Sequence, residues 1–135
     1  MLYLEKEINY MKKIIKTNNA PAAIGPYSHA ILSNNTLYCS GQIAINPETG
    51  DLVINNITNE TTQIMNNILA VLQSAKMDFS NVVKCSIFMK NLNNYGEVNK
   101  VYSDFFTKNF PAREAIEVSN LPKNVNVEIS VIAVK

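Results

Sequence analysis

The chain has 135 residues, a formal net charge of +1, and 47% hydrophobic against 17% charged residues. This size and balance are typical of one globular domain, and no apolar run approaches the roughly 20 residues that would cross a bilayer. Twelve basic against eleven acidic residues give little long-range field to attract a polyanion, so neither membrane nor nucleic-acid binding is expected.

Metal-binding residue types are scarce. Cys39 and Cys85 form no CxxC pair, and His29 is the single histidine, so a zinc site of cysteine and histidine cannot be assembled and no metal is expected. Two free thiols are typical of a reducing compartment, and we expect a cytoplasmic protein. The first eleven residues contain glutamate and no arginine, which argues against a transit peptide but leaves a mitochondrial location open.

Residues 1–11 are interpreted as an N-terminal extension and residues 12–135 as a single domain. A short strand is predicted at its start, over 12–15. The segment 19–27, NAPAAIGPY, is predicted to be an ordered loop because its prolines restrict the backbone.

Two strands are predicted at 28–33 and 36–40. Asn34-Asn35 joins them as a tight hairpin turn, since asparagine tolerates positive φ. A turn cluster, NPETGD, follows at 46–51.

A helix is predicted to begin at Thr58, with Thr58, Asn59 and Thr61 as candidate caps. Its buried stripe is expected to contain six apolar residues at helical spacing: Ile64, Met65, Ile68, Val71, Leu72 and Ala75.

The second half alternates strand and helix. We predict a strand at 82–90, a helix from residue 92 or 95 to 108, a strand at 113–118 and a last strand at 125–134. The element order β-β-β-α-β-α-β-β indicates an α+β sandwich.

Alternation in two strands predicts one apolar and one mixed sheet face. Strand 82–90 is expected to bury Val83, Cys85, Ile87 and Met89 on one side and to show Val82 and Phe88 on the other. The last strand adds Ile132 and Val134 to that second face. Two helices cover only one face of a sheet, so the other needs a cover, which an oligomer would supply.

Four runs resemble the RidA/YjgF family of reactive intermediate deaminases, members of which are often labelled endoribonuclease L-PSP. The runs are NAPAAIGPYSHA, CSGQIAINPETGDL, NLNNYGEVNKVYSDFF and FPAREAIEVSNLPKNVNVEISVIAV, and the match covers roughly residues 12–135. The resemblance implies a chorismate-mutase-like fold: a mixed sheet with two helices on one face. It also implies a homotrimer whose sheets line a central barrel, with three clefts between subunits.

The resemblance also implies an activity. Family members hydrolyse reactive enamines and imines, such as 2-aminoacrylate and 2-iminopropanoate, to 2-keto acids and ammonia, without a cofactor or metal. A small 2-imino acid is therefore the expected substrate.

Two charged residues match the family's main site positions. Arg113, in FPAR, matches the arginine that binds the substrate carboxylate, which a guanidinium can hold through two parallel hydrogen bonds. Glu128 matches the glutamate that holds or activates water, and it lies among apolar residues where a carboxylate needs partners. Without the resemblance, Arg113 would be interpreted as a surface arginine and Glu128 as a strand residue facing solvent.

Further residues complete the expected site. Tyr27 and Ser40 match hydroxyl-bearing cleft residues: Tyr27 would close over the substrate, and Ser40 would share a proton network. Gly41 lets the backbone approach closely. Asn99 matches a helix asparagine near the cleft, and His29 is expected to be structural.

The chain departs from the family at two places. Ala115 stands where a cysteine is common, so thiol chemistry is absent there, although its backbone amide can still bind an oxygen of the substrate. The loop at 107–109 is also shorter. Cys39 is interpreted as a small apolar residue beside the site, with the alternative that it replaces the missing thiol.

Two other functions remain open. One is an endoribonuclease or translation inhibitor, against which the near-neutral charge and the single histidine argue. The other is a non-catalytic module, either a small-ligand sensor or a chaperone.

Overall fold

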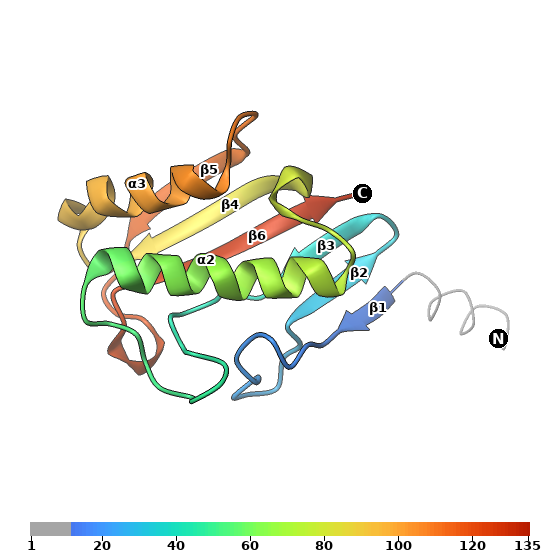
Figure 1. Ribbon diagram of the computed structural model, residues 1–135, viewed down its shortest axis with the longest axis horizontal. Helices are drawn as coiled ribbons and strands as arrows, with labels where there is room; N and C mark the ends of the chain where they lie inside the picture. The colour runs from blue at the N-terminus through green and yellow to red at the C-terminus, as the bar shows by residue number, and fades with distance from the viewer. Residues whose placement is uncertain (1–11) are drawn as a thin grey trace, which may run out of the picture.

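Residues 12–135 are described by a computed structural model, in which six strands form one sheet and two α-helices cover one of its faces (Figure 1). The predicted extension, residues 1–11, lies outside the described residues. The strands are β1 (Lys12–Ile15), β2 (Ala30–Ser33), β3 (Thr36–Cys39), β4 (Val82–Met89), β5 (Ala112–Glu117) and β6 (Val127–Val134). The α-helices are α2 (Ile57–Ser74) and α3 (Tyr95–Phe105), and short 3-10 turns occupy Phe79–Asn81, Leu92–Asn94 and Pro122–Asn124.

The last strand lies in the middle of the sheet. The order is β1-β2-β3-β6-β4-β5, and the pairs are antiparallel except for β4 with β5. The parallel pair needs a crossover connection, which α3 provides. The predicted α+β sandwich with two helices on one face is therefore confirmed.

The β2–β3 hairpin forms at the predicted position. Asn34 has φ of 53°, the left-handed conformation that a two-residue hairpin turn requires and that asparagine adopts with little strain.

Helix α2 begins with a different cap from those predicted. The side chain of Asn56 accepts a hydrogen bond of 2.7 Å from the backbone N–H of Asn59. Asn56 has an extended backbone, which lets its side chain turn back to the first turn, whereas Thr58 already lies within the helix. The predicted cap Thr61 is instead buried in the core.

The predicted faces of β4 were wrong at its first two residues. Val82 is 5% exposed and Val83 is 48% exposed, the reverse of the expectation. The pairing with β6 shifts between Val82 and Lys84, and the extra residue of this bulge moves the alternation by one position. From Cys85 onward the predicted face is correct.

Helices α2 and α3 lie over one face of the sheet (Figure 1). The core side chains come from these helices and from that face of the sheet. The opposite face, here called the open face, has no helix over it within the described residues. Several apolar side chains on it are exposed or half-buried: Ile14, Tyr38, Phe88, Ile116, Ile132 and Val134. The expectation of an uncovered, half-apolar sheet face is therefore confirmed.

Candidate active site

A cavity of about 340 Å³ lies where β3 ends and β6 begins, and four of the predicted site residues line it. They are Tyr27, Ser40, Gly41 and Glu128. The cavity continues between apolar side chains that the sequence did not single out, namely Ile24, Ile43, Ile45 and Pro122.

Glu128 provides the carboxylate of this cavity. It pairs with Phe88 of β4 and alternates with the buried Val127 and Ile129, so its side chain leaves the open face of the sheet. Burial raises the pKa of Glu128 above the ordinary glutamate value, and no neighbouring charge among residues 12–135 offsets that effect. Such a carboxyl group is poised to exchange a proton.

Gly41 makes room for that carboxylate. A Cβ built on Gly41 would lie 2.2 Å from Oε1 of Glu128. The missing side chain therefore lets the glutamate lie directly against the backbone of the neighbouring segment.

The loop before β2 is held by local hydrogen bonds. The Tyr27 hydroxyl accepts from the backbone N–H of Ile24 at 3.3 Å, and the Ser40 hydroxyl donates to the carbonyl of Ser28 at 2.5 Å. His29 lies 2.7 Å from the carbonyl of Pro21 through Nε2, and its Nδ1 accepts from Thr17. With both ring nitrogens engaged by backbone, His29 has the structural role that the sequence predicted.

Cys39 does not supply a thiolate next to Ser40. Burial raises the pKa of Cys39 to about 12, and its side chain packs against the core. The thiol therefore stays protonated at neutral pH and acts as a small apolar residue.

Two buried polar side chains of α2 hold the backbone on both sides of the cavity. Glu60 accepts from the backbone N–H groups of Asn126 and Val127 at 2.8 and 2.9 Å, next to Glu128 in sequence. Asn67 donates to the carbonyls of Ile43 and Ile45 at 3.2 and 2.9 Å. The seven-residue spacing puts both side chains on one face of the helix.

Replacing Glu60 with alanine is expected to destabilise the protein by roughly 2–4 kcal/mol, because it leaves buried backbone N–H groups unpaired. Thermal unfolding at fixed protein concentration measures this loss as a decrease in Tm. The control is Asn66→Ala on the exposed side of the same helix, which should change stability by less than about 0.5 kcal/mol. An equal effect of both variants would contradict the role assigned to Glu60.

Arg113 lies apart from this cavity, in a groove next to α3. Its Nη1 donates to Oδ1 of Asn99 at 2.7 Å, and its Nη2 donates to the hydroxyl of Tyr95 at 2.6 Å. The guanidinium carbon lies 4.8 Å from the ring centroid of Tyr102 and 5.4 Å from that of Tyr95. Hydrogen bonds and cation–π contacts thus fix the guanidinium in one orientation.

Arg113 and Glu128 leave opposite faces of the sheet. Arg113 pairs with Cys85, which is fully buried under the helices, whereas Glu128 points to the open face. Strand β4 lies between their two strands. The predicted site residues of one chain therefore form two separate groups, one around each charged side chain.

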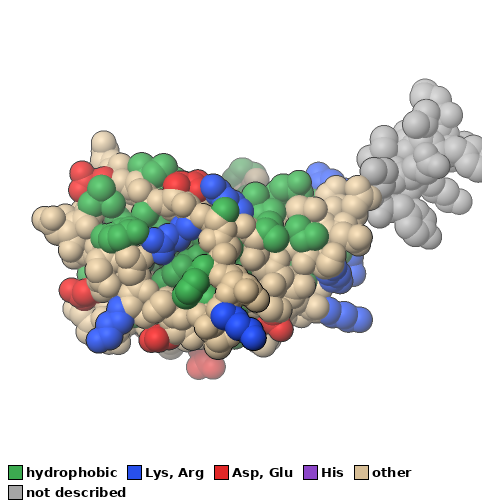
Figure 2. Space-filling view, turned by 90° about the horizontal axis from the view of Figure 1, so that it is seen from above, with side chains coloured by type: hydrophobic (Ala, Val, Ile, Leu, Met, Phe, Trp, Pro, Cys, Tyr) green, Lys and Arg blue, Asp and Glu red, His purple; other side chains and the backbone are tan. Residues whose placement is uncertain are grey.

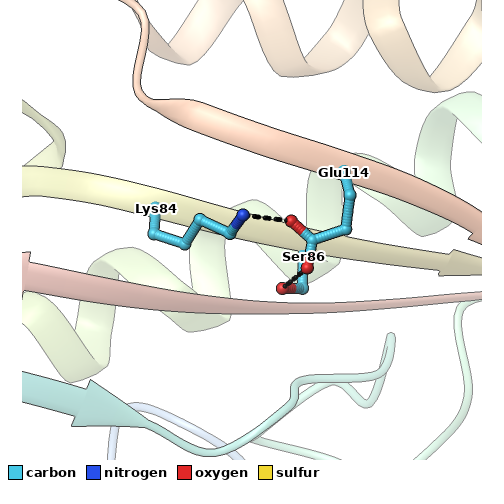
Figure 3. Close-up of polar contacts among 3 residues, drawn as sticks. All are labelled: Lys84, Ser86 and Glu114. Atoms are coloured by element: carbon cyan, nitrogen blue, oxygen red, sulfur yellow. Dashed lines mark hydrogen bonds and ion pairs between the residues drawn. The ribbon is translucent and has the colours of Figure 1, made fainter.

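A polar cluster of β4 and β5 lies on the open face of the sheet. Glu114 of β5 accepts from the Ser86 hydroxyl at 2.7 Å and forms an ion pair with Lys84 at 2.5 Å, as Figure 3 shows. The hydrogen bonds from Lys84 and Ser86 lower the pKa of Glu114, so this carboxylate is charged and paired. The pKa of Glu114 is thus lowered, whereas the pKa of Glu128 is raised.

Figure 2, seen from the side of α3 and β5, shows separate hydrophobic patches with acidic and basic groups between them. Within residues 12–135, no group of three or more His, Cys, Asp or Glu side chains could hold a metal ion. None of the helices in this range combines the length and the hydropathy needed to cross a membrane.

The family model described as Endoribonuclease L-PSP matches residues 17–135 of the chain. The chain belongs to this family. The L-PSP family fold also appears in a solved structure from Yersinia pestis, a protein of unknown function assigned to the conserved Rid protein family. That structure is 54% identical, with a TM-score of 0.90 over 92% of this chain and 99% of the other. The resemblance to RidA/YjgF proteins is therefore confirmed.

Curated L-PSP relatives have different names. A protein of Lactococcus lactis called putative regulator AldR is 50% identical over 121 residues, which cover 90% of this chain and 96% of the relative. The 2-iminobutanoate/2-iminopropanoate deaminase of Bos taurus is 46% identical over 125 residues, which cover 93% and 91%. These relatives share the family and differ in the activity that their names give.

Three side chains of α3 hold Arg113, and the L-PSP resemblance identified Asn99 but neither Tyr95 nor Tyr102. Tyr95, Asn99 and Tyr102 are spaced by four and three residues on α3, which places them on one helix face, and that spacing was visible in the sequence. Ala115, at the family's cysteine position, lies on the edge strand β5 and packs against the core.

Proposed function

We propose that the protein hydrolyses small 2-imino acids to 2-keto acids and ammonia. The observation that carries this proposal is the pair of charged groups: an oriented arginine, and a half-buried glutamate whose pKa is raised. The deaminase name of the Bos taurus relative supports the same reaction.

Arg113 would bind the substrate carboxylate. A guanidinium has five N–H donors, and the contacts with Asn99 and Tyr95 occupy two of them. The remaining three suffice for a carboxylate held through two hydrogen bonds, and the backbone amide of Ala115 on the same strand is a further candidate donor.

Glu128 would activate water on the other side of the substrate. Its carboxylate accepts a proton from the water that adds to C2 of the imine, which gives a carbinolamine. That proton goes to the imine nitrogen, which completes the carbinolamine. Glu128 then takes the hydroxyl proton of the carbinolamine and transfers it to the amine nitrogen. The carbonyl forms as the C–N bond breaks with its electrons on nitrogen, and ammonia leaves the 2-keto acid. Ser40 lies in the same cavity, and Tyr27, 48% exposed, is positioned to close over the substrate.

These roles require two copies of the chain, because Arg113 and Glu128 leave opposite faces of one sheet. A homotrimer in which the open faces pack together would bring the Arg113 group of one subunit to the Glu128 cavity of the next. The exposed apolar side chains of the open face supply the surface for such an assembly.

The test generates 2-aminoacrylate in the assay with a β-eliminating enzyme and follows pyruvate release with and without this protein. Acceleration in proportion to the protein added supports deamination. The proposal would be overturned if the folded oligomer bound pyruvate but did not speed the formation of pyruvate from 2-aminoacrylate. That result would favour a ligand sensor, which the regulator name of the Lactococcus relative suggests.

The acid side of the pH–rate profile should reflect Glu128. As a base Glu128 must be ionised, so kcat/KM is expected to fall as pH decreases through its pKa, which burial raises above the usual glutamate range. Initial rates between about pH 4.5 and 8 measure this limb. A limb at the ordinary glutamate pKa would contradict the assignment of Glu128 as the base.

A further inference from the structure

Among residues 12–135, Tyr95 is a hydroxyl partner of Arg113 that still has a proton of its own to donate. Its oxygen accepts the 2.6 Å hydrogen bond from Nη2 of Arg113, so the O–H hydrogen must be donated elsewhere. Asn99, the other partner, uses its carbonyl oxygen as an acceptor. An anion held by Arg113 therefore meets a second donor beside the guanidinium.

Tyr95 is accessible for that purpose. It lies at the start of α3 with 39% of its surface exposed, and its contact with Arg113 is open to solvent. The neighbouring Tyr102 also stacks on Arg113, but its side chain is buried and its hydroxyl has no partner among residues 12–135. Of the two tyrosines that stack on Arg113, Tyr95 is the one whose hydroxyl can reach a ligand arriving from solvent.

The electrostatic environment strengthens this donor. Hydrogen bonding with Asn99 and the charge of Arg113 lower the pKa of Tyr95. A phenol polarised by a cation donates a stronger hydrogen bond to an anion than an isolated phenol does.

We infer that Tyr95 is a specificity residue, whose hydroxyl donates a hydrogen bond to the carboxylate that Arg113 binds. The inference rests on the proposed role of Arg113 as a carboxylate-binding residue, and extends it to a hydroxyl that no resemblance assigned. Tyr95 and Arg113 together then distinguish a ligand carboxylate from a neutral amide.

The experiment measures binding of 2-oxobutanoate, a 2-keto acid of the class that the proposed reaction releases, and of its neutral amide to wild type and Tyr95→Phe by titration calorimetry. Phenylalanine keeps the ring that stacks on Arg113 and removes the hydroxyl. The keto acid should bind Tyr95→Phe roughly tenfold more weakly, whereas the amide, whose carbonyl accepts only an uncharged and weaker hydrogen bond, should lose clearly less affinity. Equal loss for both ligands, or no loss for either, would overturn the inference.

A pH series separates direct donation from positioning of Arg113. Wild-type affinity for the keto acid should fall at alkaline pH as Tyr95 ionises, because a phenolate cannot donate and repels an anion, and Tyr95→Phe should lack this limb. A guanidinium stays charged over that range. Burial raises the pKa values of the neighbouring Cys85 and Tyr102. Glu117 accepts the N–H of Leu92 near the start of α3. An identical limb in both proteins would show that Tyr95 does not donate to the ligand.

The outcomes also separate this inference from the proposed function. Selective binding of the carboxylate without turnover would leave the role of Tyr95 intact and remove the deaminase activity. Turnover together with equal affinity of wild type and Tyr95→Phe for the keto acid would support the deaminase activity and exclude the role of Tyr95.

Discussion

Mixed oligomers of Arg113→Ala and Glu128→Ala chains are expected to regain activity that each variant alone has lost. Each single variant should fall by roughly 10²-fold or more, because one loses substrate orientation and the other the base. Since the two side chains leave opposite faces of the sheet, a complete cleft of the proposed kind would combine Arg113 of one copy with Glu128 of its neighbour.

The expected recovery follows from cyclic symmetry. In a ring of three chains that contains both variants, one cleft has both side chains whatever the ratio, so the mixed trimer should show about one third of wild-type activity. Co-expression of the two chains with different tags, followed by purification through both tags, isolates such mixtures. Activity that stays at the level of the single variants would contradict a site shared between copies.

Gly41→Ala is expected to lower kcat/KM by roughly 10²-fold while leaving the fold intact. The new Cβ would lie 2.2 Å from Oε1, 3.0 Å from Cδ and 3.2 Å from Cγ of Glu128. All three atoms belong to one flexible side chain, so the carboxylate moves and the backbone stays. Initial rates and thermal unfolding of the same preparation measure both effects.

Gly96→Ala is the matched control for that substitution. Apart from its chain neighbours and the adjacent helix backbone, no atom lies within 4 Å of the position that its Cβ would occupy, and Gly96 lies in α3. Alanine should leave the rate unchanged and stabilise the helix by about 0.5–1 kcal/mol. A Gly41→Ala enzyme with wild-type rates would show that the position of Glu128 against the backbone is unimportant for catalysis.

Much of the fold followed from local patterns in the sequence. The Asn34 turn, the buried stripe of α2 and the half-apolar face of β6 each depend on residues close together in the chain, and these predictions were correct. The faces at the start of β4 were predicted wrongly because the bulge opposite β6 depends on pairing with a strand more than 40 residues away.

The separation of Arg113 and Glu128 onto two faces of the sheet was not predicted for the same reason. Alternation along β6 placed Glu128 on the mixed face, but the face on which Arg113 lies depends on the register of β5 against β4, which no local pattern contains. Glu60 and Asn67 could have been found, because both polar residues fall on the predicted buried stripe of α2 and therefore needed partners.

The placement of Arg113 and Glu128 on opposite faces also gives the proposed enzyme a dependence on its own abundance. Under the proposed function, a newly made chain would carry two half-sites, and neither would turn over an imine until another copy docks. After synthesis begins, the activity would therefore rise more steeply than the amount of protein. Dilution below the dissociation constant of the assembly would switch the reaction off without unfolding any subunit.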